Sequence, residues 1–353
     1  MPPLANHERV IDLAIPPGVV AVDIGPDNGV WKGGRLRSVE RNDSTGTNQV
    51  ATAQVTAALV RAYGALPPLV RAMRPLQWTK NALVFAALIF DRKFVDPESV
   101  LLAFGAALCF CFVSSAGYLV NDVRDAERDR IHPVKRFRPV ANGEISERTA
   151  LITAGALVLV SLVIGSLIRL EFTLVLIGYV LLMLSYNLGL KQVPILDVFA
   201  IGGGFVFRAA GGAVAIAVPI SPWLYVCTML LALLVGFTKR RQELVFLEGR
   251  ADQHRESLGG YSVPVLDQYI TILAAATIIA YSVYTFDAPA VPRNHVMMLT
   301  IPFVAYGLFR FLAIARESEL GGRPEALLFV DKPLLASVIG WGIASALIVL
   351  IAG

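Results

Sequence analysis

Long apolar runs separated by short charged segments dominate the chain from about residue 66 onward. Runs that approach or exceed about 20 residues are long enough to cross a bilayer as helices. They predict membrane spans at roughly 99–120, 149–168, 172–187, 195–214, 222–238, 268–286, 296–315 and 333–352. A first span is predicted at 81–91, extended backward by residues 66–78. The pattern therefore predicts an all-α integral membrane domain of nine transmembrane helices in residues 66–353.

The first 65 residues follow a different pattern, with Pro, Gly, Asn, Asp and Ser scattered through short apolar runs. No sustained period is present, and no basic segment leads into an apolar core and a cleavage site, so we expect no signal peptide. We predict a poorly ordered cytoplasmic extension. Between residues 55 and 74, apolar positions interleave with arginines, which is typical of a helix lying in the membrane interface.

Composition agrees with a lipid environment. Of the 353 residues, 56% are hydrophobic and 16% are charged, whereas soluble domains carry about a quarter charged residues. This excludes an ordinary soluble enzyme, and a net charge of +4 is too small to indicate a nucleic-acid partner. The three cysteines, Cys109, Cys111 and Cys227, lie in apolar stretches without the paired spacing of a zinc site or a disulfide framework.

The basic residues are unevenly distributed. Nine of the 31 lie at or before Lys80, and 17 lie in the alternate segments 121–148, 187–194, 239–267 and 310–332. Because cytoplasmic loops are enriched in Lys and Arg, these segments and the N-terminus are expected in the cytoplasm, as nine spans allow. We therefore expect a multi-pass membrane protein whose charged loops face the cytoplasm.

An acidic stripe follows the second span. Asp122, Asp125 and Asp129 are spaced by three and four residues, so a continuing helix would place them on one face, with Asn121 in front. Three carboxylates this close favour a cation, and Mg²⁺ suits a few carboxylates completed by water and phosphate oxygens. The alternative is a solvated helix end whose arginines pair with the acids.

A cationic run comes directly afterwards, with Lys135, Arg136 and Arg138 between two prolines. Cations beside a metal-bearing stripe would neutralise the charge that develops on a departing pyrophosphate. A cytoplasmic loop would also be basic for topology alone. That alternative explains the number of cations but not their position next to the aspartates.

Further polar residues lie at other span ends. Tyr186 and Lys191 bracket the end of the fourth span, and Arg208 lies inside a glycine-rich span, where a guanidinium needs a partner or a polar cavity. Asp197 is eleven residues from Arg208, too far along a helix for direct pairing. Trp78, Lys80 and Asn81 lie together at the start of the first span, where Trp and Lys are common interfacial anchors.

The third cytoplasmic loop offers two interpretations. Lys239 and Arg240 end the sixth span, which makes them candidates for a phosphate, and Tyr261 lies later in the same loop. Glu248, Asp252 and Glu256 recur every four residues, which indicates either a second acidic stripe or, slightly favoured, a surface helix.

Together these residues resemble the UbiA superfamily of membrane prenyltransferases over about residues 70–353. The resemblance rests on the motif Asn121-Asp122-x-x-Asp125-x-x-x-Asp129, the Tyr186 to Lys191 segment and the glycine-rich helix with Arg208. It implies nine transmembrane helices around a central cavity with a cytoplasmic-side cap, and two Asp-rich motifs that hold a prenyl diphosphate through Mg²⁺. The second motif departs from the family, because no DxxxD pair occurs after Lys239 and Asp252-x-x-x-Glu256 is the nearest approach.

One branch of that superfamily is similar in three further motifs. They are Gln77-Trp78-x-Lys80-Asn81, His132-Pro133-x-Lys135-x-x-Arg138-Pro139 and Lys239-Arg240-x-x-Glu243-Leu244. Members of this branch, in mycobacteria and their relatives, transfer 5-phosphoribose from phosphoribosyl pyrophosphate to decaprenyl phosphate, which begins the synthesis of the arabinose donor for cell-wall arabinan.

The resemblance implies roles for individual residues. Asn121 would orient Asp122, Asp125 and Asp129, which would hold Mg²⁺ and the pyrophosphate. Lys135, Arg136 and Arg138 would meet the pyrophosphate or the 5-phosphate. The cavity where the donor and the lipid phosphate meet would be lined by Lys80, Asn81, Tyr186, Lys191, Arg208, Lys239, Arg240 and Tyr261.

Two other functions stay open from the sequence. An aromatic or quinone prenyltransferase would use a prenyl diphosphate as donor. A cation-coupled transporter would place its acids at an intramembrane site, whereas the acids here gather at a cytoplasmic mouth. The sequence leaves the polyprenyl chain length open, and a homo-oligomer is compatible with it.

Overall fold

A computed structural model of the chain describes residues 10–14, 29–32, 35–39, 65–132, 135–219, 221–246, 256–288, 294–317, 327–328 and 330–352. The α-helices are α2 (Pro68–Ala72), α3 (Ala86–Phe90), α4 (Pro97–Arg124), α5 (Ala126–Ile131), α6 (Glu147–Ile168), α7 (Leu170–Leu188), α8 (Leu196–Ala215), α9 (Pro222–Phe246), α11 (Val263–Asp287), α12 (Ile301–Glu317) and α14 (Lys332–Ala352). The 3₁₀ helices are η1 (Pro75–Phe85), η2 (Lys93–Val95), η3 (Lys135–Phe137), η4 (Leu190–Gln192), η5 (Glu256–Gly260) and η6 (Val296–Thr300).

Eight helical segments within these residues are long and apolar enough to cross a membrane. They are α4, α6, α7, α8, α9, α11, α12 together with η6, and α14. Each coincides with one of the eight later spans that the sequence predicts, so an all-helical, multi-pass membrane domain is confirmed. Two of these helices carry a proline where they begin, at the first residue of α9 and in the first turn of α11. Proline is tolerated there because amides in the first turn have no hydrogen-bond acceptor within the helix.

The first predicted span differs from one continuous helix. It consists of α2, η1 and α3. The helix is interrupted at Arg74, which has a positive φ of 55° and lies directly before Pro75. Proline disfavours the right-handed helical conformation in the residue before it and donates no amide hydrogen bond. Among the described residues there are therefore eight continuous spans and one broken segment, where the sequence predicts nine whole helices.

Close packing accommodates the 3₁₀ geometry of η1. A Cβ atom added to Gly212 of α8 would lie 1.9 Å from the carbonyl oxygen of Val84 in η1, so only glycine permits this approach. Backbone that departs from α-helix at membrane depth is tolerated where protein buries it. The glycine-rich sequence of α8 thus explains why η1 fits directly against it.

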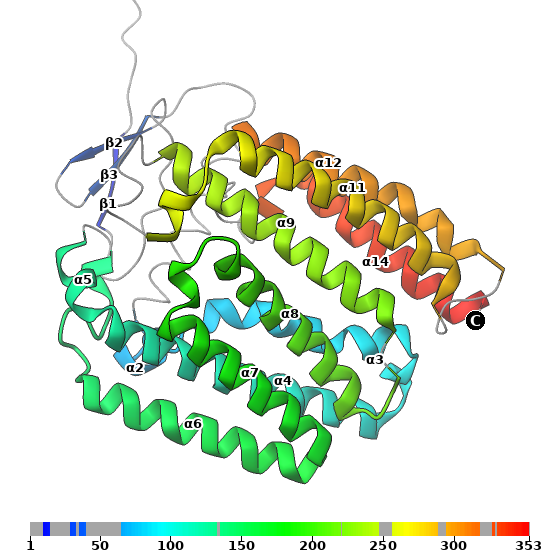
Figure 1. Cartoon of the computed structure of the whole chain (residues 1–353), viewed down its shortest axis with the longest axis horizontal. Helices are drawn as coiled ribbons and strands as arrows, with labels where there is room; N and C mark the ends of the chain where they lie inside the picture. Colours follow the sequence, from blue (N-terminus) through cyan, green and yellow to red (C-terminus); the bar gives the residue numbers. More distant parts are fainter. Residues whose placement is uncertain are drawn as a thin grey trace, which may run out of the picture. The chain divides into compact units, whose positions relative to one another are not determined.

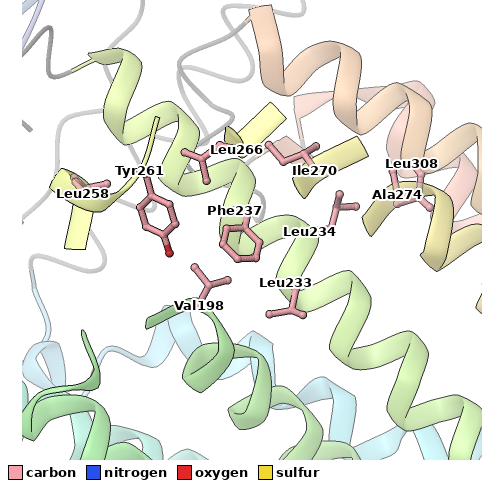
Figure 2. Close-up of a cluster of buried hydrophobic side chains, with 10 residues drawn as sticks. All are labelled: Val198, Leu233, Leu234, Phe237, Leu258, Tyr261, Leu266, Ile270, Ala274 and Leu308. Carbon is pink, nitrogen blue, oxygen red and sulfur yellow. The ribbon is translucent and has the colours of Figure 1, made fainter. Parts of the chain in front are cut away.

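The chain forms two compact units, residues 1–75 with 118–154 and residues 76–117 with 155–353. In the second unit, α9 lies between α8 and α11, and α7 packs on the other side of α8 (Figure 1). α8, α9 and α11 share a buried apolar cluster that includes Val198, Phe237 and Leu266 (Figure 2). This cluster lies beside the polar ends of the same helices, where several candidate site residues are found.

The first unit contains α2, α5 and η3, and also three short strands. The strands are β1 (Val10–Ala14), β2 (Gly29–Lys32) and β3 (Arg35–Val39), which form an antiparallel sheet in the order β1-β3-β2. Apart from these strands and residue 65, the predicted N-terminal extension lies outside the described residues. The predicted interfacial helix at 55–74 is described only from residue 65, and α2 is the helix within that described part.

Candidate functional site

Two aspartates of the predicted stripe converge on one arginine in the first unit. α4 ends at Arg124, and α5 continues its path because the amide of Asp125 donates to Asn121 and that of Asp129 to Asp125. Asp122 and Asp129 are only 2% and 3% exposed. Nη1 of Arg138 lies 3.2 Å from Oδ1 of Asp122 and 2.6 Å from Oδ2 of Asp129.

Arg74 is a second cation of this cluster and was not among the predicted site residues. Its guanidinium donates to Asp122 and lies 4.8 Å from the ring centre of Tyr118. Burial of a carboxylate is costly unless charged partners satisfy it, so Arg74 and Arg138 together explain how Asp122 can be buried. The signal available in the sequence was an arginine directly before a proline, a residue pair that ends a helix.

The two buried aspartates fit a divalent cation. Oxygens from both approach a single cationic nitrogen, so their negative charge converges on one position. Mg²⁺ is commonly bound through one or two carboxylates, with phosphate and water oxygens completing its shell. Within the described ranges, no group of three or more His, Cys, Asp or Glu side chains is arranged to hold a metal ion. Asp125 is half-buried, and its place among the ligands stays a prediction.

The other predicted residues of this unit are more accessible. Lys135 and Arg136 are exposed on η3, and Asn121 is half-buried in α4. The guanidinium of Arg136 lies 4.8 Å from the ring centre of Phe137. Arg138 keeps a quarter of its side chain exposed, so a guanidinium that is paired with buried carboxylates also reaches the surface.

In the second unit, Arg208 and Asn81 are brought together across 127 positions of sequence. Arg208 is buried in α8, and its Nε donates to Oδ1 of Asn81 at 2.6 Å. Its two terminal nitrogens donate to the carbonyl of Gly204 and the hydroxyl of Tyr179, each at 2.8 Å. The arginine therefore has a polar partner at each nitrogen, as a charge inside a membrane helix requires, and all three are neutral.

A second buried network joins the ends of α8 and α9 to the segment before α11. Asp197 accepts a hydrogen bond from Nε of Arg240 and another from the hydroxyl of Tyr261, both at 2.8 Å. Arg240 is 2% exposed and also pairs with Glu243. Burial, followed by the hydrogen bond to Asp197, raises the pKa of Tyr261, so its hydroxyl remains the donor in this pair. Asp197 thus has Arg240 as its cation, in agreement with its predicted separation from Arg208.

Three predicted lysines and a tyrosine belong to the same unit and keep part of their surface exposed. Lys80 is half-buried in η1, Tyr186 and Lys191 are half-buried in α7 and η4, and Lys239 is exposed on α9. Glu248 and Asp252, and the side chain of Glu256, lie outside the described residues. The two interpretations of that acidic stripe stay as they were.

These observations define a protein with a multi-pass, all-helical membrane domain, in which buried carboxylates are paired with guanidinium groups. The profile of the UbiA prenyltransferase family matches residues 82–331. The chain belongs to the UbiA prenyltransferase family, and it is a membrane transferase. Family membership favours an enzyme over the cation-coupled transporter.

Two curated relatives and one solved structure show how far the similarity extends. A decaprenyl-phosphate phosphoribosyltransferase of Mycolicibacterium smegmatis is 33% identical over 77% of this chain and 89% of its own length. One of Mycobacterium tuberculosis is 32% identical, covering 77% and 91%. A UbiA homolog from Archaeoglobus fulgidus, solved bound to GPP and Mg²⁺, has a TM-score of 0.60 at 20% identity and covers 80% of this chain and 97% of that chain. The last comparison establishes the fold.

Proposed function

We propose that this protein transfers 5-phosphoribose from phosphoribosyl pyrophosphate to a polyprenyl phosphate such as decaprenyl phosphate, with Mg²⁺ and with release of pyrophosphate. Relatives that carry this activity in their name, at 32–33% identity over 77% of the chain, are the main support. The buried Asp122 and Asp129 beside two guanidinium groups are a second support, because a diphosphate donor requires both a metal site and cations.

The proposed reaction makes and breaks one bond each at C1 of the ribose. A phosphate oxygen of the lipid attacks C1 while the C1–O bond to pyrophosphate breaks, and the bonding electrons leave with pyrophosphate. Little proton transfer is needed, so catalysis depends on positioning and charge stabilisation. When bound, Mg²⁺ supplies Lewis-acid neutralisation of the departing diphosphate.

The residues of the first unit fit the donor end of this reaction. Asp122 and Asp129, with Asp125, would hold Mg²⁺, and Asn121 would orient them. Arg138 would contact the pyrophosphate, because its guanidinium is both anchored by buried acids and partly exposed. Lys135 and Arg136, exposed on η3, would meet the same group or the 5-phosphate.

The residues of the second unit fit phosphate recognition. The lipid phosphate or the 5-phosphate would meet three cations and a hydroxyl that are at least partly exposed, those of Lys80, Lys191, Lys239 and Tyr186. Asn81 and Arg208 form one hydrogen-bonded unit and would act together. Arg240 and Tyr261 would serve this group from within the buried network with Asp197.

The distribution of charge supports a location for this activity. We place the charged loops on the cytoplasmic face of a bacterial plasma membrane, where a soluble sugar donor is accessible. The lipid product would then enter the route to a cell-wall arabinan precursor.

The test is a donor assay in membranes that contain the protein. Labelled phosphoribosyl pyrophosphate with decaprenyl phosphate and Mg²⁺ is expected to give a labelled lipid, and EDTA is expected to abolish it until Mg²⁺ is restored. The rival is an aromatic or quinone prenyltransferase, which would consume a prenyl diphosphate in the same membranes. Turnover of prenyl diphosphate with no labelled lipid from the sugar donor would refute the proposal.

A further inference from the structure

A strained turn precedes α8. Ile195 has φ 70° and ψ −53°, and the amide of Leu196 donates to the carbonyl of Pro194 across 2.8 Å. A hydrogen bond between residues two apart, with positive φ at the central residue, is the rarer and strained type of γ-turn. A β-branched residue is a genuine outlier at positive φ. Surrounding structure must therefore hold this turn in place.

The buried network of Asp197, Arg240 and Tyr261 keeps the turn in this conformation. The amide of Ile195 donates to the hydroxyl of Tyr261, and the same hydroxyl donates to Oδ1 of Asp197. Figure 2 shows the Tyr261 hydroxyl directed toward Val198 at the start of α8. Oδ2 of Asp197 is in turn bonded to Arg240 of α9, so the turn is tied to two other segments. We call Asp197, Tyr261 and Arg240 the turn clasp.

Close packing of η5 against the turn brings the Tyr261 hydroxyl within hydrogen-bonding distance of the Ile195 amide. A Cβ atom added to Gly260 would lie 2.3 Å from Cγ of Pro194, so η5 approaches the turn where only glycine fits. The Tyr261 ring also packs edge-on against Phe237 of α9, with ring centres 6.2 Å apart. The hydroxyl is thus aimed at the turn by a ring that cannot easily move.

The strained turn ends the short connection that carries Lys191. This connection runs from the end of α7 at Leu188 to the start of α8 at Leu196, and η4 forms its middle. Hydrogen bonds from Gln192 to Gly189 and from Val193 to Leu190 make η4 a stiff turn. The direction of the chain at Ile195 therefore sets the position of the Lys191 backbone.

We propose that Asp197, Tyr261 and Arg240 are positioning residues, which hold the Ile195 turn so that Lys191 meets a phosphate group of the substrate. This proposal rests on the proposed function, since it takes Lys191 as a phosphate ligand. It gives Arg240 and Tyr261 an indirect role, because both are buried and Arg240 already donates to two carboxylates.

Tyr261→Phe tests the proposal with the ring retained and both hydrogen bonds removed. The KM of phosphoribosyl pyrophosphate or of decaprenyl phosphate is expected to rise at least about fivefold, with a smaller change in kcat, because a displaced contact weakens binding. The matched control is Tyr281→Phe. Tyr281 of α11 is buried like Tyr261, and its hydroxyl has two hydrogen bonds of 2.6 Å, to Thr300 and Trp341. This variant is expected to leave both parameters unchanged.

A double-mutant cycle with Lys191→Ala asks whether the clasp acts through that lysine. In the Lys191→Ala background, Tyr261→Phe is expected to add nothing, because the group it positions is gone. Additive effects, or an unchanged KM in Tyr261→Phe alone, would overturn the proposal. Adding Ile195→Gly to Tyr261→Phe is expected to bring the KM most of the way back down to the wild-type value, because glycine adopts positive φ without strain.

Hydrogen exchange of residues 189–197 gives a readout that needs no activity. Tyr261→Phe is expected to accelerate exchange in this segment, and Tyr281→Phe is expected not to. Unchanged exchange in Tyr261→Phe would show that no clasp exists. A wild-type protein that transfers no phosphoribose would instead refute the proposed function, while the exchange result would still decide whether the clasp holds the turn.

Discussion

Arg138 joins two buried carboxylates, so its loss should be costly in a way that a surface arginine's is not. Arg138→Gln keeps a long polar side chain and removes the charge that Asp122 and Asp129 share. Truncating one partner of a buried charge pair costs about 2–5 kcal/mol, much of it from the charge left behind. Because Arg138 is a quarter exposed and Arg74 still pairs with Asp122, we take about 3 kcal/mol within that range.

The kinetic effect has a separate cause, because Arg138 is also the proposed contact for the departing pyrophosphate. Removing one donor to a group that gains charge in the transition state lowers the rate by about two to three powers of ten, so we expect kcat/KM for phosphoribosyl pyrophosphate to fall by about two powers of ten. The kcat/KM of Arg138→Lys is expected to lie between those of wild type and Arg138→Gln, since an ammonium group keeps the charge but not the planar, bidentate geometry of a guanidinium. The assay is formation of labelled lipid by purified protein at several donor concentrations.

The matched control for this prediction is Arg130→Gln. Arg130 lies in the same segment, but it and its partner Glu147 are both 53% exposed at a separation of 3.5 Å. Exposed pairs contribute little, so activity is expected to stay within about twofold of wild type. The reasoning is refuted if Arg138→Gln keeps more than about a third of wild-type kcat/KM, or if Arg130→Gln loses as much as Arg138→Gln.

Three further predictions concern the metal site, the packing of η1 and the N-terminal segment. The variants Asp122→Ala and Asp129→Ala are each expected to insert in the membrane but to form little lipid product. High Mg²⁺ is expected to restore their activity only in part. Full activity in both variants would indicate a solvated charged helix end instead of a metal site. Gly212→Ala should lower the yield of folded protein in detergent, because its Cβ would meet the backbone of η1, whereas Gly155→Ala, with no atom within 4 Å, should not. Deleting residues 1–60 should leave turnover in membranes intact, since no proposed ligand lies there, and a large loss would contradict this.

Much of the fold follows from hydropathy alone. The eight later spans were predictable because each carries an apolar window long enough to cross a bilayer. The broken first segment was not, because its geometry depends on a positive φ at Arg74 and on contact between η1 and Gly212 of α8. Hydropathy reports that a segment is apolar but not whether protein or lipid surrounds it.

The candidate site was predictable where spacing along one helix decides the geometry. Asp122 and Asp129 meet because they lie seven residues apart on one helical path, which periodicity predicts. Asp197 and Arg240 lie 43 positions apart, and only the packing of α8 beside α9 brings them together. That pairing buries Arg240, a residue that the sequence suggests as an accessible phosphate ligand.

The measurement that tests the central claim most directly follows the 5-phosphate and the pyrophosphate of the donor separately. Purified protein is incubated with decaprenyl phosphate, Mg²⁺ and phosphoribosyl pyrophosphate labelled either in the 5-phosphate or in the pyrophosphate. The account predicts that the 5-phosphate label enters the lipid and the pyrophosphate label is released. No lipid labelled from the 5-phosphate, together with consumption of a prenyl diphosphate offered in parallel, would contradict it.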